Sequence, residues 1–158
     1  MIKLIGFLFA FTAVYAHERI FYLPDHHTRF IHFMSRSFKN SEHILILTPS
    51  LSHSELKKEL LSAVKKGSTL HLITHNSAGD PLSLVQYRNI ELSLSPLHLA
   101  QSAIVIDDTL VCTSDGAIEE DFFRSSRSRI RCSDNPQNVR AVRKSFQPLI
   151  QRAKNYLE

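Results

Sequence analysis

Two kinds of apolar pattern alternate in the first half of the chain, and this alternation limits the fold more than any other feature. Residues 25–39 and 54–66 carry apolar side chains at helical spacing, and Ser54 is expected to cap the second helix. Each is followed by a compact apolar run typical of a buried strand, at residues 42–48 and 68–74. This order predicts an α/β domain in which helices pack on a sheet.

The second half is expected to consist mainly of strands. Short apolar segments occur at residues 90–94, 97–106, 109–113 and 127–132. Residues 17–23 suit an edge strand, and residues 138–156 predict a closing helix that Pro148 kinks or divides. Together the two halves predict a mixed β-sheet flanked by helices.

The first sixteen residues have the pattern of an export signal. Lys3 is followed by an apolar core, and Val14 and Ala16 place small residues before a cleavage point at His17. The core is too short to cross a bilayer, which needs roughly 20 apolar residues. We therefore predict a signal peptide at residues 1–16 and one periplasmic or secreted domain at residues 17–158, without a stable membrane span. An uncleaved membrane anchor is the alternative.

The chain has two cysteines, Cys112 and Cys132. Export would place them in an oxidising compartment, where an even number of cysteines favours a disulfide. Two free, buried thiols are the alternative.

The formal net charge of the chain is +4, and basic residues crowd its last third. Arg127, Arg129 and Arg131 alternate along a predicted strand, so their side chains would share one face. Such a row suits the phosphates of nucleic acid or another phosphodiester, and these arginines are candidate ligand-binding residues. A row of charges that protects an edge strand from aggregation explains the pattern too.

Residues 97–117, LHLAQSAIVIDDTLVCTSDGA, together with the order of the elements, resemble a single domain of the phospholipase D superfamily. The short exported endonucleases of that superfamily are similar in layout from about Phe21 to Ala153. Their signature is His-x-Lys-x4-Asp, followed by a Gly-Ser-x-Asn-like turn. Asp107 matches the signature aspartate and Ser114 the turn serine. The resemblance implies a phosphodiesterase fold and a homodimer that joins two signatures.

The other signature positions have changed in this chain. Ala100 stands at the histidine position, Ser102 at the lysine position and Gly116 at the asparagine position, while Arg127 lies near the usual acidic residue. In the family one histidine attacks phosphorus, a second protonates the leaving oxygen, and the lysines neutralise phosphate charge. Alanine can do neither step, and no lysine occurs between Lys66 and Lys144. The pattern indicates a pseudoenzyme.

His98 is the one candidate for a substitute catalytic residue, since on a strand it would share a face with Ala100. A partly buried histidine without a chemical role is the alternative. Asp107 and Ser114 are candidate site residues through the resemblance, although structural hydrogen bonds explain them equally well. His71 and His75 lack a third ligand at recognisable spacing, so neither a metal nor a cofactor is predicted.

Three functions are compatible with these residues. The first is a non-catalytic exported domain that binds a phosphodiester, nucleic acid among them, or a protein partner. The second is an active nuclease or phospholipase D-type phosphodiesterase that uses His98. The third is a structural domain whose ancestral groove no longer binds anything.

Overall fold

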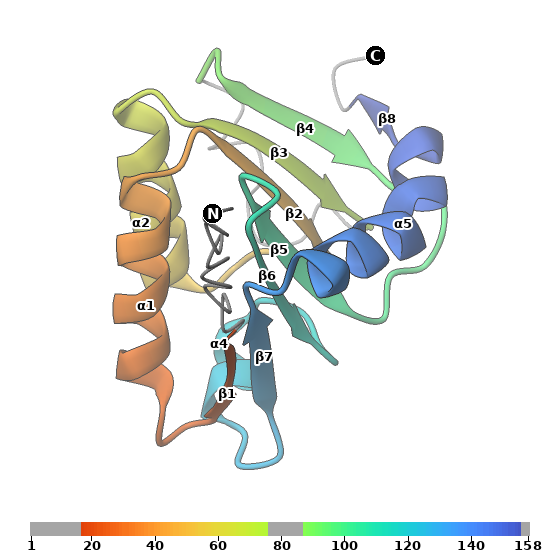
Figure 1. The fold of residues 1–158 in the computed structure, drawn as a ribbon. Helices are drawn as coiled ribbons and strands as arrows, with labels where there is room; N and C mark the ends of the chain where they lie inside the picture. Colours follow the sequence, from red (N-terminus) through yellow and green to blue (C-terminus); the bar gives the residue numbers. More distant parts are fainter. Residues whose placement is uncertain (1–16, 76–86, 156–158) are drawn as a thin grey trace, which may run out of the picture.

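The computed structural model describes residues 17–75 and 87–155, so the predicted signal peptide lies outside the described residues. Within these ranges the strands form one eight-stranded mixed sheet (Figure 1). The elements in chain order are β1 (Glu18–Tyr22), α1 (His27–Lys39), β2 (His43–Thr48), α2 (Ser54–Lys65), β3 (Thr69–Thr74), β4 (Ile90–Leu94), β5 (Ser102–Ile106), β6 (Leu110–Ser114), α4 (Glu120–Arg124), β7 (Arg129–Ser133), α5 (Pro136–Arg152) and β8 (Lys154–Asn155).

The strand order across the sheet is β1-β7-β6-β5-β2-β3-β4-β8. The two helix-strand units of the first half contribute the parallel pairs β2–β3 and β3–β4. Strands β5, β6, β7 and β1 continue the sheet from β2 in antiparallel pairs. The predicted α/β class, with a mixed sheet flanked by helices, is confirmed.

Helices α1 and α2 cover one face of the sheet (Figure 1). Their apolar stripes come from residues three or four apart, as the helical spacing predicts. These side chains pack on Ile46 and Leu72 of the central strands and form the main core. The buried stripes consist of Phe30, Ile31, Met34 and Phe38 in α1, and Leu56, Leu60, Ala63 and Val64 in α2.

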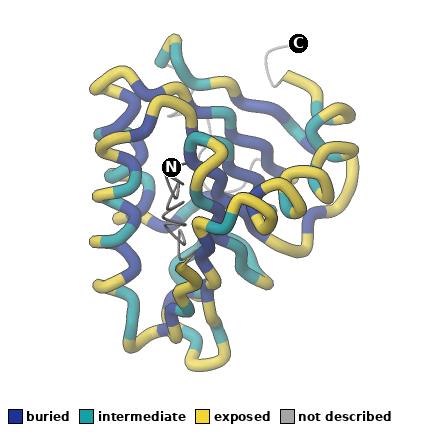
Figure 2. Tube along the Cα trace, viewed as in Figure 1, coloured by how far each residue is buried: buried dark blue, intermediate teal, exposed yellow. Residues whose placement is uncertain are grey.

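Helix α5 lies against the other face and forms a smaller core. Val139 of α5 packs on Val105 and Val111, with Leu45 and Val142 at the margin. Most of α5 is exposed (Figure 2). Among the described residues, no helix is both long and apolar enough to cross a membrane.

The closing helix differs from its prediction. It spans Pro136–Arg152 without a break at Pro148, and residues 154–155 form β8 rather than helix. Pro148 is exposed, so water can satisfy the backbone carbonyl that its missing N–H leaves without an intrahelical bond.

Strands β5 and β7 also begin later in the chain than predicted, at Ser102 and Arg129. The segment before β5 is held in a loop because the Ser95 hydroxyl bonds both the N–H and the carbonyl oxygen of Leu97, at 3.2 and 2.9 Å. Arg127 lies in a turn before β7, where its N–H donates to Ser125 Oγ at 3.3 Å. Only Arg129 and Arg131 therefore alternate on the strand.

Helix α2 begins one residue earlier than a Ser54 cap would place it, and α4 was not predicted at all. His53 is the N-cap residue, and its Nδ1 accepts a hydrogen bond from the Leu56 N–H at 3.3 Å. Helix α4 has five residues, which is too short for a helical period to be seen in the sequence.

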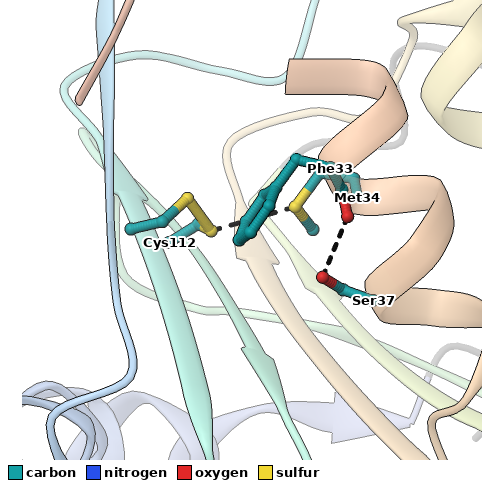
Figure 3. The surroundings of a disulfide bond; sticks show 5 residues. Phe33, Met34, Ser37 and Cys112 are labelled. Atoms are coloured by element: carbon teal, nitrogen blue, oxygen red, sulfur yellow. Dashed lines mark hydrogen bonds between the residues drawn. A yellow bond between two sulfur atoms is a disulfide. The ribbon is translucent and has the colours of Figure 1, made fainter. Parts of the chain in front are cut away.

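The predicted disulfide between Cys112 and Cys132 is present. The two cysteines lie directly opposite each other in β6 and β7, and both are buried. Met34 of α1 places its sulfur 3.8 Å from Cys112 Sγ, and Phe33 extends from the same helix toward the sheet (Figure 3). The bridge therefore fastens the sheet at a point where it supports α1.

The residue before β1 is tied to the residue after β7. The backbone N–H of His17 donates to the Asp134 carboxylate, and the Asp134 N–H donates to the His17 carbonyl oxygen at 3.2 Å. The two hydrogen bonds hold the start of the described chain against the sheet.

Replacing both cysteines by alanine should lower the free energy of unfolding by about 3 kcal/mol, because the bridge closes a loop between residues 20 apart. Urea unfolding of the two proteins, each with and without dithiothreitol, measures the difference. Reductant should destabilise the native protein and leave the double variant unchanged. Equal unfolding midpoints for all four samples would contradict the role given to the bridge.

Candidate functional site

The signature positions lie at the two ends of β5. Ser102 is the first residue of β5 and pairs with Ser114, the last residue of β6, while Ala100 precedes the strand and is exposed. Asp107 lies at the opposite end, in the turn between β5 and β6. The aspartate position is thus separated by the full length of β5 from the positions that would carry catalytic groups.

Ser102 is buried in a hydrogen-bonded network where a charged lysine would have to lie. Its Oγ is 2.6 Å from the Gly116 carbonyl oxygen and 2.8 Å from Thr48 Oγ1. Thr48 Oγ1 in turn donates to the Ser50 carbonyl oxygen at 2.8 Å and accepts the Ile118 N–H at 3.1 Å. Only 2% of Ser102 is exposed. The network joins the start of β5 and the end of β2 to the chain that follows β6.

Aromatic side chains of α4 fill the space beside Gly116. A Cβ on Gly116 would lie 2.5 Å from Cδ2 of Phe122, so the phenyl ring occupies the place of any side chain at this position. The hollow that remains among Ser102, Ser114 and Phe122 is about 10 Å³. That volume is about one water probe, so this internal cavity has no room for a phosphodiester. The exposed residues Ala100 and His98 lie outside the cavity.

The two matching residues of the signature have structural roles. The Asp107 carboxylate accepts the backbone N–H of Glu42 at 3.0 Å and that of His43 at 2.7 Å. These bonds fasten the β5–β6 turn to the start of β2, with Asp107 at a φ of 50°. Ser114 Oγ donates to the Gly116 carbonyl oxygen at 3.1 Å.

His98 does not share a strand with Ala100, because both residues lie before the start of β5. Its exposed ring meets His75 edge-on, with the ring centroids 4.9 Å apart. The expected alignment of His98 with the signature position was therefore wrong, while its pairing with a second imidazole was not foreseen.

Comparisons with known proteins support the fold. The structure is similar to NucT from Helicobacter pylori, with a TM-score of 0.78 and 15% identity over 90% of this chain and 100% of that chain. It is also similar to Nuc from Salmonella typhimurium, a phospholipase D family member, with a TM-score of 0.70 and 15% identity over 90% of this chain and 99% of that one. The chain has the phospholipase D fold.

A third solved structure with this fold is TrmBL2, an archaeal chromatin protein, with a TM-score of 0.59 and 11% identity over 87% of this chain and 53% of that chain. No family model matches the sequence, and no curated protein matches it either. The resemblance to the phospholipase D superfamily is thus confirmed through the structure, at the level of the fold.

The arginines of β7 lie on an exposed face of the phospholipase D fold. Arg129 is opposite Tyr22 of β1, and Arg131 is opposite Ile20. Arg131 Nε also pairs with Glu18 Oε1 at 3.3 Å, which neutralises part of its charge.

A pair of histidines near α4, His27 and His53, is not indicated by any pattern in the sequence. The rings of His27 and His53 are 5.0 Å apart, and the buried His53 stacks on Phe123 with its centroid 4.0 Å away. Because His53 Nδ1 accepts the Leu56 N–H, the proton of the neutral ring is on Nε2, which lies 3.7 Å from Glu120 Oε2. The N-cap role of His53 has no simple sequence signal, since Ser54 is the more usual cap.

The charge state of His53 follows from its burial. Loss of hydration lowers the pKa of His53, with the nearby Glu120 carboxylate opposing that shift. Burial also lowers the pKa of His71, which lies 3.1 Å from Ser93 Oγ and 3.8 Å from Glu91. Across residues 17–75 and 87–155, no three or more His, Cys, Asp or Glu side chains are grouped to hold a metal ion.

Restoring the family residue at Gly116 should destabilise the protein. Gly116→Asn forces a side chain into the Phe122 ring, and such overpacking costs about 1–3 kcal/mol. Phe122→Ala should recover much of that stability in the double variant, because it vacates the contested space. Urea unfolding of the native protein, the two single variants and the double variant gives a double-mutant cycle. Additive effects of the two substitutions would show that the ring does not block position 116.

The lowered pKa of His53 predicts that stability decreases in mild acid. An unfolded histidine takes up a proton near pH 6.5, whereas the folded ring resists protonation until a lower pH. The free energy of unfolding should therefore be constant above about pH 7.5, fall as the pH drops below about 6.5, and level off below the folded pKa. Urea unfolding across this range measures the curve.

His53→Asn keeps a capping side chain and removes the titration, so its curve should be flatter than that of the native protein. His71→Gln is the matched control, since it removes only the second histidine with a lowered pKa. Identical curves for the native protein and His53→Asn would contradict the assignment.

Proposed function

We propose that this chain is an exported, non-catalytic domain with the phospholipase D fold that binds a phosphodiester polymer, namely nucleic acid. The observation that carries the proposal is that the lysine and asparagine positions of the signature are filled. Ser102 is buried in hydrogen bonds, and Phe122 fills the space beside Gly116. Losing a catalytic nucleophile costs several orders of magnitude in rate, so the proposal is binding rather than catalysis.

The charge of the surface supports an anionic ligand. Arg129 and Arg131 project from β7, and Arg127 precedes them in the turn. We propose that these three arginines bind phosphates. TrmBL2, of which the match covers 53%, is described as an archaeal chromatin protein with a novel mode of DNA binding. A protein that contains this fold thus binds DNA, which supports testing nucleic acid as the ligand.

Export is proposed from the signal pattern of residues 1–16. The first strand begins at Glu18, so cleavage after Ala16 would leave the whole sheet intact. The family resemblance also predicts a homodimer. The absence of the signature histidine at Ala100 removes the catalytic reason for a second copy, and we therefore propose the single domain as the binding unit.

Purified residues 17–158 should bind nucleic acid, and the affinity should fall steeply with salt because binding to phosphates releases counterions. Fluorescence anisotropy with labelled single-stranded and duplex DNA, from about 50 to about 200 mM salt, measures this dependence. Arg129→Ala/Arg131→Ala should weaken the binding of both ligands to a similar extent and reduce the salt slope by about 1 for each arginine that binds a phosphate. Absence of binding at the lowest salt would eliminate nucleic acid and favour a protein partner or a purely structural domain.

The alternative function is an active phosphodiesterase. It is favoured by one observation, the exposed pair of His98 and His75. Incubating the same protein with bis(p-nitrophenyl) phosphate should give no turnover above the buffer. Hydrolysis that His98→Ala abolishes would establish the alternative, whereas hydrolysis that survives this substitution would indicate another site or a contaminant.

A further inference from the structure

A basic groove runs between the edge strand β1 and helix α1, in a part of the fold that the signature does not include. The hollow has a volume of about 550 Å³. None of the residues that line it is acidic. Its polar and aromatic lining consists of Arg19, Phe21, His26, Arg29, His32, Phe33 and Arg36.

The spacing of side chains along β1 and along α1 explains how the groove forms. Side chains alternate across β1, so Arg19 and Phe21 face α1 while Tyr22 faces the opposite way. On α1, Arg29 and Arg36 are seven residues apart with Phe33 between them, which places all three on one side of the helix. The buried stripe of α1 packs on the sheet, so this basic side is left at the margin next to β1.

The charge of the groove is not neutralised within the described chain. Arg29 and Arg36 are exposed, and the ion pairs of the described residues involve neither of them. Two acids near the groove have other basic partners, since Glu18 pairs with Arg131 and Asp134 with His17. An anion in the groove would therefore meet arginines that carry no internal counter-ion.

Aromatic and imidazole rings alternate with these arginines. The Arg19 guanidinium lies over the Phe33 ring, 5.1 Å from its centroid. Tyr22 is 54% exposed, and its ring meets that of His26 with the centroids 5.8 Å apart. Tyr22 is also the cross-strand neighbour of Arg129. The tyrosine therefore links the groove to the arginines of β7 around the free edge of β1.

The groove continues beyond this hollow. A second hollow of about 310 Å³ shares Arg19 and Phe33 with the first and extends to Leu110 and Cys132. It also contains His17 and one carboxylate, Asp134, which accepts the His17 backbone N–H. The two hollows together follow the length of β1, which suits an extended chain better than a compact anion.

We infer that the groove between β1 and α1 binds single-stranded nucleic acid, with phosphates on Arg29 and Arg36 and with unpaired bases against Tyr22, which lies just outside the groove beside His26, where the strand would pass around the free edge of β1. The inference rests on the proposed binding of nucleic acid and assigns it a place and a strand preference. Proteins that hold single strands combine a positive groove with rings on which bases stack. Inorganic polyphosphate has no bases, and a duplex keeps its base faces stacked, so neither gains from the rings.

The test compares two double variants that remove the same charge. Arg29→Ala/Arg36→Ala removes two exposed arginines from the groove. Arg140→Ala/Lys144→Ala removes two exposed cations from α5, on the other face of the sheet. Circular dichroism and urea unfolding establish that both variants fold. The probe is labelled oligothymidylate of about 16 nucleotides, the upper end of typical site sizes.

The groove variant should bind the oligothymidylate about tenfold more weakly or worse, with the salt slope reduced by about 0.7 for each phosphate that is no longer neutralised. The α5 variant should stay within about twofold of the native protein, because it changes only the long-range charge. Tyr22→Ala should cost about fivefold or more and Tyr22→Phe much less, since phenylalanine keeps the stacking face. Duplex DNA should bind more weakly than the single strand, and polyphosphate should compete poorly.

Equal reductions of affinity in the two double variants would overturn the assignment of the groove and leave the proposed function standing. Equal reductions of single-strand and duplex affinity in the groove variant, or full competition by polyphosphate, would overturn the preference for unpaired bases. Absence of binding by the native protein at low salt would remove the proposed function and this inference together.

Discussion

The hydrogen bonds around Ser102 hold together one end of the central strands β5 and β2 and the segment that follows β6. The Ser102 hydroxyl joins the start of β5 to Thr48 at the end of β2 and to the chain after β6. Thr48 also holds the Ile118 N–H and therefore positions the segment that leads into α4. A buried hydroxyl is stable only when its bonds are made, so the serine, the threonine and the glycine carbonyl constrain one another. With that network in place, Phe122 and Phe123 of α4 pack beside Ser102 and Ser114.

The sequence allowed most of the fold to be predicted where apolar spacing decides the structure. The helix at residues 54–66 is predicted because it must bury one apolar stripe against the sheet. The strands at residues 42–48 and 68–74 are predicted because they must bury both of their faces. The errors lie where a single polar side chain sets the boundary. The Ser95 hydroxyl holds the chain out of β5, and Ser125 organises the turn that removes Arg127 from β7. Such bonds depend on local geometry that a pattern of apolar residues does not record.

The candidate site was predictable only in part. Ala100 and Ser102 revealed that catalytic groups were missing, but the filling of the space by Phe122 depends on a five-residue helix without a visible period. The groove between β1 and α1 could not be foreseen, because Arg19 is placed beside α1 by the pairing of β1 with β7. That pairing joins segments more than a hundred residues apart. The phospholipase D fold thus keeps its framework while its binding chemistry is proposed at a different edge.

The hydrogen bond between His17 and Asp134 gives the predicted maturation of the chain a physical consequence. In the full chain the His17 nitrogen is an uncharged amide that donates one hydrogen bond to the Asp134 carboxylate. Cleavage after Ala16 would turn the same nitrogen into an ammonium group, so that both the donor and the acceptor of this bond would carry charge. Removal of the signal would then tighten the outer strand against β7, next to the groove. Export would then be linked to the packing of β1 on β7 through the backbone nitrogen of His17.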